Sequence, residues 1–137
     1  ARACGYTPVI IDPRPAFAAQ ERFTDETLID AWPDTALESL GMDARMAVVT
    51  LSHDPKLDDL AIIASLGSNV FYLGCLGSKR TQAKRLDRLR DAGFGDDDLA
   101  RINGPVGLDL GGRQPAEIAI SIMAQITQTL RKPSRTV

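Results

Sequence analysis

Two segments of the sequence combine a strand-like apolar run, a glycine-rich turn and basic residues at the start of a helix-like stretch. The first covers residues 71–80 (Phe-Tyr-Leu-Gly-Cys-Leu-Gly-Ser-Lys-Arg) and the second covers residues 106–113 (Val-Gly-Leu-Asp-Leu-Gly-Gly-Arg). Glycines let the backbone approach a ligand, and the first N–H groups of a helix are unpaired and favour negative charge. Each turn is therefore predicted to hold an anion. The two turns would form one site if they lie at the same edge of one parallel sheet.

Strand-like and helix-like segments alternate along the chain, which favours an α/β fold with a parallel sheet and helices on both of its faces. Capping and periodicity signals mark three helices. They are expected from Pro55 to about Gly67 with Asp54 as N-cap, from Lys79 to about Asp91 with Ser78 as N-cap, and from Pro115 onward. The last helix shows an apolar stripe at i+4 spacing, formed by Ile118, Ile122, Ile126 and Leu130. Strands are predicted at residues 9–11, 47–51 and 69–73. Residues 95–101 are predicted as a loop or a short helical turn, and residues 132–137 as a polar tail after a domain at 1–131.

Length and composition restrict the possible partners. A chain of 137 residues with 44% hydrophobic residues suits one compact domain. The net charge of -2 gives no reason to expect nucleic acid or an anionic membrane surface as a partner. No signal peptide is recognisable, and no apolar run approaches the roughly 20 residues of a spanning helix, so we expect a cytoplasmic protein. Two cysteines, Cys4 and Cys75, indicate neither a disulfide framework nor a zinc site.

The N-terminal part resembles a dinucleotide-binding unit that lacks its beginning. Residues 1–5 look like the last turn of a helix, and the strand at 9–11 ends in Asp12. In such units an acidic residue about 20 positions after a glycine-rich turn binds the ribose. Only eleven residues precede Asp12, and no G-x-G-x-x-G occurs. We therefore expect a Rossmann-like domain without its first strand and glycine-rich turn, whose open sheet edge is covered by another chain or segment, most simply in a homo-oligomer.

Four separated motifs resemble the C-terminal Rossmann-like domain of the XdhC/CoxI family and together cover nearly the whole chain. They are residues 9–14 (Val-Ile-Ile-Asp-Pro-Arg) with Phe17 and Arg22-Phe23, residues 52–58 (Ser-His-Asp-Pro-Lys-Leu-Asp), residues 72–80 and residues 107–119. The family's N-terminal domain with its cysteine motif is absent from the sequence, as is the glycine-rich turn. Cys75 does not match the family pattern and inherits no role from it.

The resemblance implies a non-enzymatic accessory factor for molybdenum hydroxylases such as xanthine dehydrogenase. Such a factor would bind molybdenum cofactor, assist its sulfuration together with a cysteine desulfurase, and insert it into the hydroxylase. Molybdopterin carries a phosphate and often a nucleotide, so the same donors would also serve NAD(P). A nucleotide-binding Rossmann domain of an oxidoreductase is therefore the alternative, and a purely structural or regulatory domain is a third.

The predicted ligand-binding residues follow the matched motifs and the two glycine turns. They are Asp12, Arg14, His53, Asp54, Gly74, Gly77, Ser78, Lys79, Arg80, Asp109, Gly111, Gly112 and Arg113. No catalytic residue and no metal ligand is predicted.

Most of these residues also have an ordinary structural interpretation. The basic residues at 79–80 would belong to a solvated helix face that continues through Lys84, Arg85, Arg88 and Arg90. Arg113 would pair with Asp109, and Asp12 with Arg14 or Arg22. His53 would be a donor, acid or base, or a turn residue that holds a backbone carbonyl.

Further residues near the motifs are expected to be structural. Asp54 is expected to cap a helix, and Asp58 and Asp59 to be exposed. Cys75 is expected to be a small buried strand residue. The alternative is a reactive thiolate at a helix start. Glu117 is expected to stabilise the first turn of its helix. Packing is the expected role of the aromatic side chains Trp32, Phe17 and Phe23.

Overall fold

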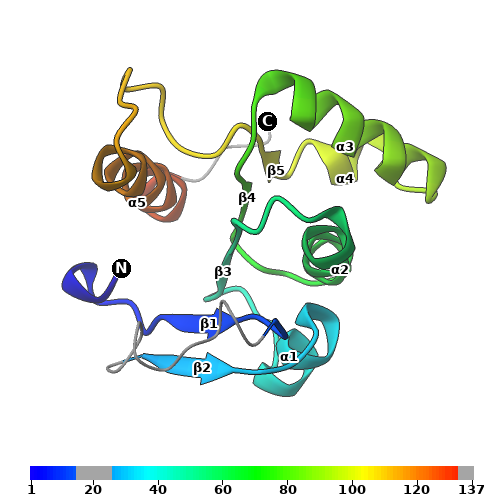
Figure 1. Ribbon diagram of the computed structural model, residues 1–137, viewed down its shortest axis with the longest axis horizontal. Coiled ribbons are helices and arrows are strands. Elements are labelled where there is room, and N and C mark those ends of the chain that lie inside the picture. Colours follow the sequence, from blue (N-terminus) through cyan, green and yellow to red (C-terminus); the bar gives the residue numbers. More distant parts are fainter. Residues whose placement is uncertain (15–25, 133–137) are drawn as a thin grey trace.

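The computed structural model describes residues 1–14 and 26–132, which form an α/β fold (Figure 1). In chain order its elements are η1 (Arg2–Cys4), β1 (Val9–Ile11), β2 (Thr27–Ile29), α1 (Pro33–Leu40), β3 (Ala47–Thr50), α2 (Pro55–Leu66), β4 (Tyr72–Cys75), α3 (Lys79–Asp91), α4 (Asp96–Leu99), β5 (Ile102–Asn103) and α5 (Pro115–Arg131).

All strand pairs among the described residues are parallel, and the strands form two separate sheets. One sheet pairs β1 with β2, and the other has the order β3-β4-β5. The known doubly wound order 3-2-1-4-5-6 contains both arrangements if β2 and β1 take places 3 and 2, and β3, β4 and β5 take places 4, 5 and 6. Among the described strands, none occupies the central place between β1 and β3. Each of these two strands therefore has one hydrogen-bonded neighbour.

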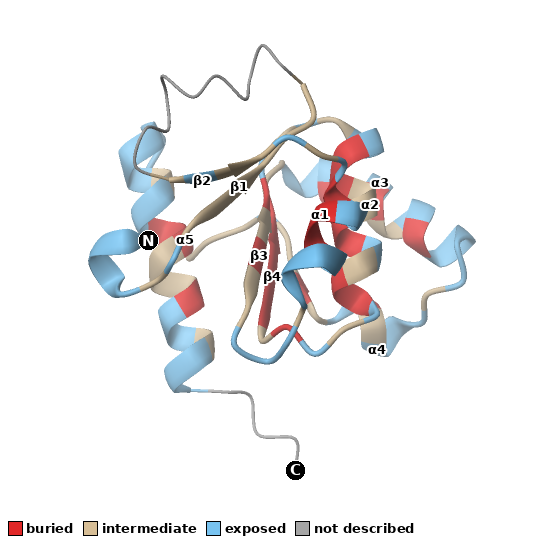
Figure 2. Cartoon of the chain, turned by 90° about the horizontal axis from the view of Figure 1, so that it is seen from below, coloured by how far each residue is buried: buried red, intermediate tan, exposed pale blue. Residues whose placement is uncertain are grey.

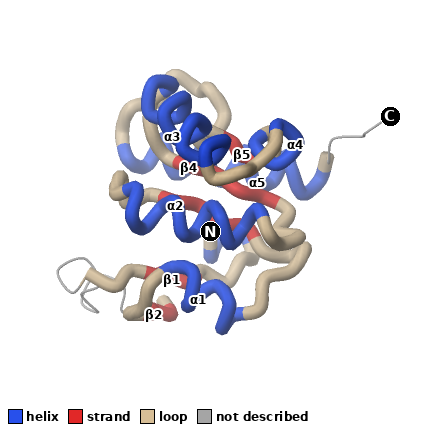
Figure 3. The backbone as a smooth tube through the Cα atoms, turned by 90° about the vertical axis from the view of Figure 1, so that its right-hand side faces the viewer, coloured by secondary structure: helices blue, strands red, loops and turns tan. Residues whose placement is uncertain are grey.

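Helices cover both faces of the three-stranded sheet. In Figures 1 and 2, α5 lies on one side of β3 and β4, and α1, α2 and α3 lie on the other. Figure 3 views the molecule from the side of these three helices, with α1, α2 and α3 stacked from bottom to top. The predicted α/β class with helices on both faces is confirmed.

The core consists of two apolar clusters, one on each face. The larger one, on the side of α1, α2 and α3, includes Ile62, Leu73, Cys75 and Leu89, all of which are almost completely buried. The smaller one lies under α5 and centres on Tyr72 together with two α5 residues, Ile122 and Ile126. Most of the predicted Ile stripe of α5 is thus confirmed as core, whereas Leu130 at its end is 39% exposed.

The caps read from the sequence are present. The backbone N–H of Lys56 donates to the Asp54 carboxylate at 3.0 Å, and that of Thr81 donates to the Ser78 hydroxyl at 3.1 Å. Both helices begin where these caps predict, because each cap satisfies a donor that the helix leaves open. The residues predicted as a loop or turn at 95–101 contain the four-residue helix α4.

Several short elements differ from the sequence prediction. The third predicted strand, 69–73, lies at Tyr72–Cys75 instead, and the strand expected at Val106 is replaced by β5. The backbone of Val106 still donates to the Cys75 carbonyl at 3.1 Å. Both β2 and α1 were missed. The segment Thr27–Ile29 lacks the continuous β-branched apolar run that marked Val9–Ile11. Helix α1 follows Trp32, which provides no side-chain cap.

The thiol of Cys75 is an interior group. Its side chain is 0% exposed, and burial raises its pKa, while the neighbouring Thr50 hydroxyl and the Arg85 charge act in the opposite direction. The interpretation of Cys75 as a buried strand residue is confirmed.

In the native chain we expect one fast-reacting thiol, the exposed Cys4, and one protected thiol, Cys75. A neutral thiol shielded from solvent is a poor nucleophile. Mass spectrometry after a short treatment with iodoacetamide at neutral pH would measure this, with the Cys4→Ser variant expected to stay unlabelled until denaturant is added. Rapid labelling of Cys75 in the folded Cys4→Ser variant would contradict its burial.

Within the part of the chain that the structure describes, no helix has both the length and the apolar character needed to cross a membrane.

Candidate anion-binding site

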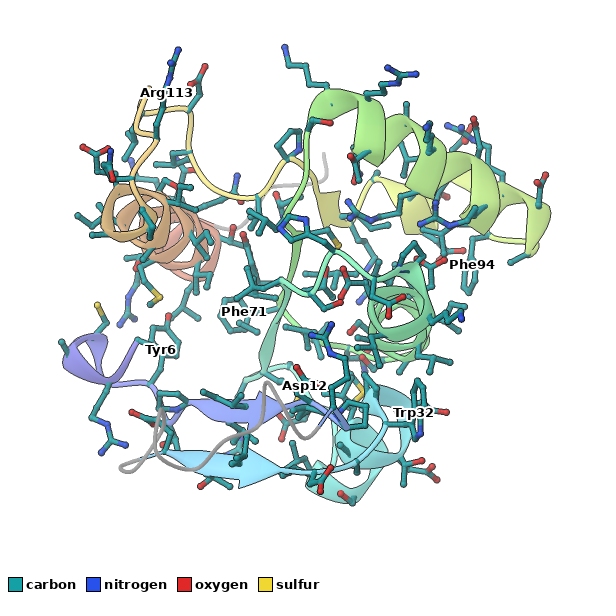
Figure 4. The ribbon with its side chains drawn as sticks, in the orientation of Figure 1. Tyr6, Asp12, Trp32, Phe71, Phe94 and Arg113 are labelled. Carbon is teal, nitrogen blue, oxygen red and sulfur yellow. The ribbon has the colours of Figure 1, made fainter. Side chains whose placement is uncertain are left out.

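The parallel strands direct their following segments toward a common ligand-binding edge. The segment 12–14 follows β1, the segment 51–54 follows β3, and the segment 76–80 follows β4. Figure 4 shows Asp12 at the tip of the β1 arrow. The negative charges of Asp54 and Asp58 reach Arg14, where they add to the larger effect of Asp12 in raising its pKa. The ends of β1 and β3 are therefore electrostatically connected.

Asp12 is held by Arg14. Two side-chain nitrogens of Arg14, Nε and Nη2, donate to the two Asp12 oxygens at 3.0 and 2.9 Å, and the Arg14 backbone N–H donates to Oδ1 at 2.9 Å. The hydrogen bonds from Arg14 lower the pKa of Asp12. The alternative of pairing with Arg14 is thus confirmed, and Arg22 lies outside the described residues. A ribose would have to compete with this bidentate contact.

The turn between β3 and α2 is organised by a buried carboxylate. Asp58 is only 6% exposed, and its Oδ1 accepts from the Ser52 hydroxyl at 2.5 Å and from the Ser52 backbone N–H at 3.4 Å. His53, between Ser52 and the Asp54 cap, adopts the left-handed conformation with φ 61°. That conformation is costly for a residue with a Cβ, and the His53 side chain is exposed. Among the described residues, the ring has no hydrogen-bond partner.

The expectation that Asp58 and Asp59 are exposed was wrong for Asp58. Its carboxylate lies under the β3–α2 turn, in the same helical stripe as the buried Ile62 and Ser65. Asp59 is half-buried and accepts from Arg88 Nε at 2.9 Å and Nη2 at 3.1 Å.

Substitution of Asp58 by alanine is expected to lower the free energy of unfolding by about 1–3 kcal/mol, because it leaves the hydroxyl and N–H of Ser52 without their acceptor. The matched variant Asp59→Ala breaks only a partly exposed ion pair and should cost about 0–1 kcal/mol. Urea denaturation followed by circular dichroism would measure both. Equal losses for the two variants would show that the Ser52 contact does not stabilise the turn.

The turn between β4 and α3 presents open backbone donors. Ser78 caps the helix through Thr81, but among the described residues the backbone N–H groups of Lys79 and Arg80 have no hydrogen-bond acceptor. Both side chains are exposed. Gly77 has φ 143°, and a Cβ there would lie 2.9 Å from Cγ2 of Thr81. This turn therefore requires glycine and keeps the positive end of α3 accessible.

The second glycine turn, before α5, is closed by its own helix. Oε1 of Glu117 accepts from the backbone N–H of Arg113 at 3.1 Å and from that of Gln114 at 3.0 Å. These bonds lower the pKa of Glu117. The expected first-turn role of Glu117 is confirmed, and its carboxylate takes the place that an external anion would occupy at this helix start.

The predicted site residues fall into separate groups. Figure 4 shows Arg113 at the top of the view, in the loop before α5, and Asp12 below the centre, after β1. Asp109, Gly111 and Gly112 are exposed in the same loop as Arg113, and no ion pair joins Arg113 to Asp109 within the described chain. Gly74 is buried in β4, where Val106 and Tyr72 fill the space beside it. The charges of Asp54 and Asp58 connect the group at 52–54 with Arg14. Figure 1 shows the start of α3 at the top of the view, as it does the loop before α5.

Two residues near the site were misread in the sequence. Arg85 was assigned to the solvated basic face of α3, but it is only 3% exposed. The helical spacing already indicated this burial, because Gln82 and Arg85 share one face of the helix with the inward Leu89. Trp32, expected to pack, is 52% exposed before α1. The other two aromatic predictions, Phe17 and Phe23, fall outside the described residues.

No group of three or more His, Cys, Asp or Glu side chains within residues 1–14 and 26–132 is arranged to hold a metal ion.

Comparison with known proteins identifies the family. The family model described as the XdhC Rossmann domain matches residues 1–126. The chain therefore belongs to the XdhC Rossmann domain family, and the resemblance drawn from its motifs is confirmed.

Similar proteins include a probable xanthine dehydrogenase subunit from Bacillus subtilis, 32% identical over 129 residues, which cover 93% of this chain and 37% of that protein. "Molybdenum cofactor insertion chaperone PaoD" of Escherichia coli is 32% identical over 102 residues, covering 74% of this chain and 31% of that protein. A crystal structure described as a xanthine dehydrogenase from Bacillus halodurans superimposes with a TM-score of 0.77 at 29% identity, covering 97% of this chain and 38% of that one. This chain thus spans less than two fifths of each of these relatives.

Proposed function

We propose that this domain belongs to a cytoplasmic maturation factor that binds molybdenum cofactor and assists its sulfuration and insertion into a xanthine dehydrogenase-type hydroxylase. The observation that carries the proposal is the open β4–α3 turn, where unpaired backbone donors, Lys79 and Arg80 stand at the positive end of a helix. Phosphate is the group that such a turn fits, and molybdopterin carries one. The name of PaoD as an insertion chaperone supports the same role.

The factor acts by binding and transfer, without turnover of its own. The described residues around the turn offer charge and hydrogen bonds, and none of them forms a proton-transfer pair with His53. Partners under this proposal are the hydroxylase and a cysteine desulfurase. Another strand, from a second copy or another segment, would cover the open edges of β1 and β3.

The competing oxidoreductase function receives less support from the site. A dinucleotide-binding domain uses its acidic residue to bind the ribose, but Asp12 already accepts two side-chain bonds from Arg14. NAD and NADP therefore serve as comparison ligands.

The test is anaerobic equilibrium binding of molybdenum cofactor to the chain and to the double variant Lys79→Ala, Arg80→Ala. We expect saturable binding that becomes weaker by about tenfold or more, because two cations and their charge-assisted hydrogen bonds are lost. Lys84→Ala, which removes an exposed cation further along the same helix, is the matched control and should bind normally. Absence of cofactor binding by the folded chain, or tighter binding of NAD or NADP, would overturn the proposal.

A further inference from the structure

A buried guanidinium lies directly behind the β4–α3 turn. Arg85 projects from α3, is 3% exposed, and donates from Nη1 to Oε1 of Gln82 at 2.6 Å and from Nη2 to the Leu76 carbonyl at 3.0 Å. A Cβ placed on Gly77 would lie 3.7 Å from Nη2. The charged end of Arg85 therefore reaches the same turn that opens α3.

No carboxylate compensates this charge among the described residues. Both hydrogen-bond acceptors of Arg85 are neutral, and its Nε is buried without any partner. The neighbouring acids of α2 are already engaged, Asp58 with Ser52 and Asp59 with Arg88. A buried charge is costly unless an opposite charge or full hydrogen bonding offsets it. Arg85 thus places a buried positive charge behind the turn without an ion-pair partner among the described residues.

The contact with Leu76 also sets the polarity of the turn. Because the Leu76 carbonyl points inward to Arg85, its negative end is directed away from the outer surface, where the N–H groups of Lys79 and Arg80 remain open. Anion-binding turns need this arrangement, with donors outward and carbonyls inward. The start of α5 has no such open donors, because the N–H groups of Arg113 and Gln114 already donate to Glu117.

From this geometry we infer that the β4–α3 turn is a phosphate subsite and that Arg85 is its buried positioning residue. The ligand class is a phosphate or diphosphate group, held by the N–H groups at the start of α3 and by Lys79 and Arg80. Arg85 holds the turn in its donor-outward form and supplies the positive charge behind it. The inference rests on the proposed function in taking that phosphate to belong to the bound cofactor.

The experiment is a titration of the ¹⁵N-labelled chain with inorganic pyrophosphate, followed through backbone amide shifts. We expect saturable shifts at residues 77–80. The Arg85→Gln variant should bind more weakly, with an apparent Kd raised by about tenfold or more. Arg85→Lys keeps the charge without the planar fork, so it should lose stability but retain binding to within about threefold. Lys84→Gln, one residue away and exposed, should leave binding unchanged. Inorganic phosphate as a second probe separates a monophosphate site from a diphosphate site.

Three results would overturn the inference: no shifts at residues 77–80, shifts confined to residues 111–114, or equal binding by Arg85→Gln. If that variant does not fold, the shift map of the unaltered chain and the Arg85→Lys comparison still decide the question. Pyrophosphate binding without cofactor binding would leave the subsite standing and reject the proposed function. Cofactor binding without shifts at residues 77–80 would support the proposed function and reject the phosphate subsite.

Discussion

Replacing Tyr72 with alanine is expected to lower the free energy of unfolding by about 3–5 kcal/mol, the usual cost of removing a buried aromatic ring. Tyr72 is 2% exposed, and its ring lies in the core between β4 and α5. Its hydroxyl donates to Oε1 of Gln125 at 2.6 Å, and the same oxygen accepts from the Gly107 backbone N–H at 2.9 Å. A loss of this size is a large fraction of the roughly 5–15 kcal/mol that stabilises a typical domain.

Tyr72→Phe separates the ring from the hydroxyl. It preserves the apolar packing and removes one hydrogen bond, so its cost should be about 0.5–1.5 kcal/mol. Denaturant unfolding gives both values, and hydrogen exchange at the amides of α5 shows whether the helix loosens locally. A small loss in the alanine variant would mean that α5 contributes little to the stability of the sheet.

Replacing Gly107 with alanine is expected to cost about 2–6 kcal/mol, the sum of a backbone and a steric effect. Its φ of 95° is strained for any residue with a side chain, which costs about 1–3 kcal/mol. The new Cβ would also overlap the Ser121 hydroxyl and lie 3.2 Å from the backbone nitrogen of Ile122, and such overpacking costs about 1–3 kcal/mol. Since Ile122 N is backbone, the contact can be relieved only by moving the loop or α5.

Gly111→Ala is the matched control, because Gly111 also has a positive φ, 74°, but no atom of the described residues lies within 4 Å of its Cβ position. Its cost should therefore be that of the backbone strain alone, about 1–3 kcal/mol. The difference between the two variants, measured by thermal and urea unfolding, isolates the steric effect. Equal losses would mean that the loop yields easily and that Gly107 does not fix the position of α5.

Local chemistry was read reliably from the sequence where it acts within one element. The caps Asp54 and Ser78 and the isoleucine stripe of α5 depend on neighbouring residues, and the structure confirms them. Burial of charged groups was read poorly. A helical pattern tells which residues share a face, but whether a charge on that face finds a buried partner depends on other elements, as for Asp58 with Ser52 and Arg85 with Leu76.

The sequence by itself determined the α/β class, the family and the two candidate turns, because alternation, capping and motif order are properties of neighbouring residues. Only the tertiary structure decided that these turns differ. Glu117 closes the one before α5, whereas the one before α3 stays open above a buried Arg85. It also decided the division of the sheet between β1 and β3. These outcomes depend on contacts between residues distant in the chain, and the free energy of such contacts is set by packing, burial and charge in three dimensions.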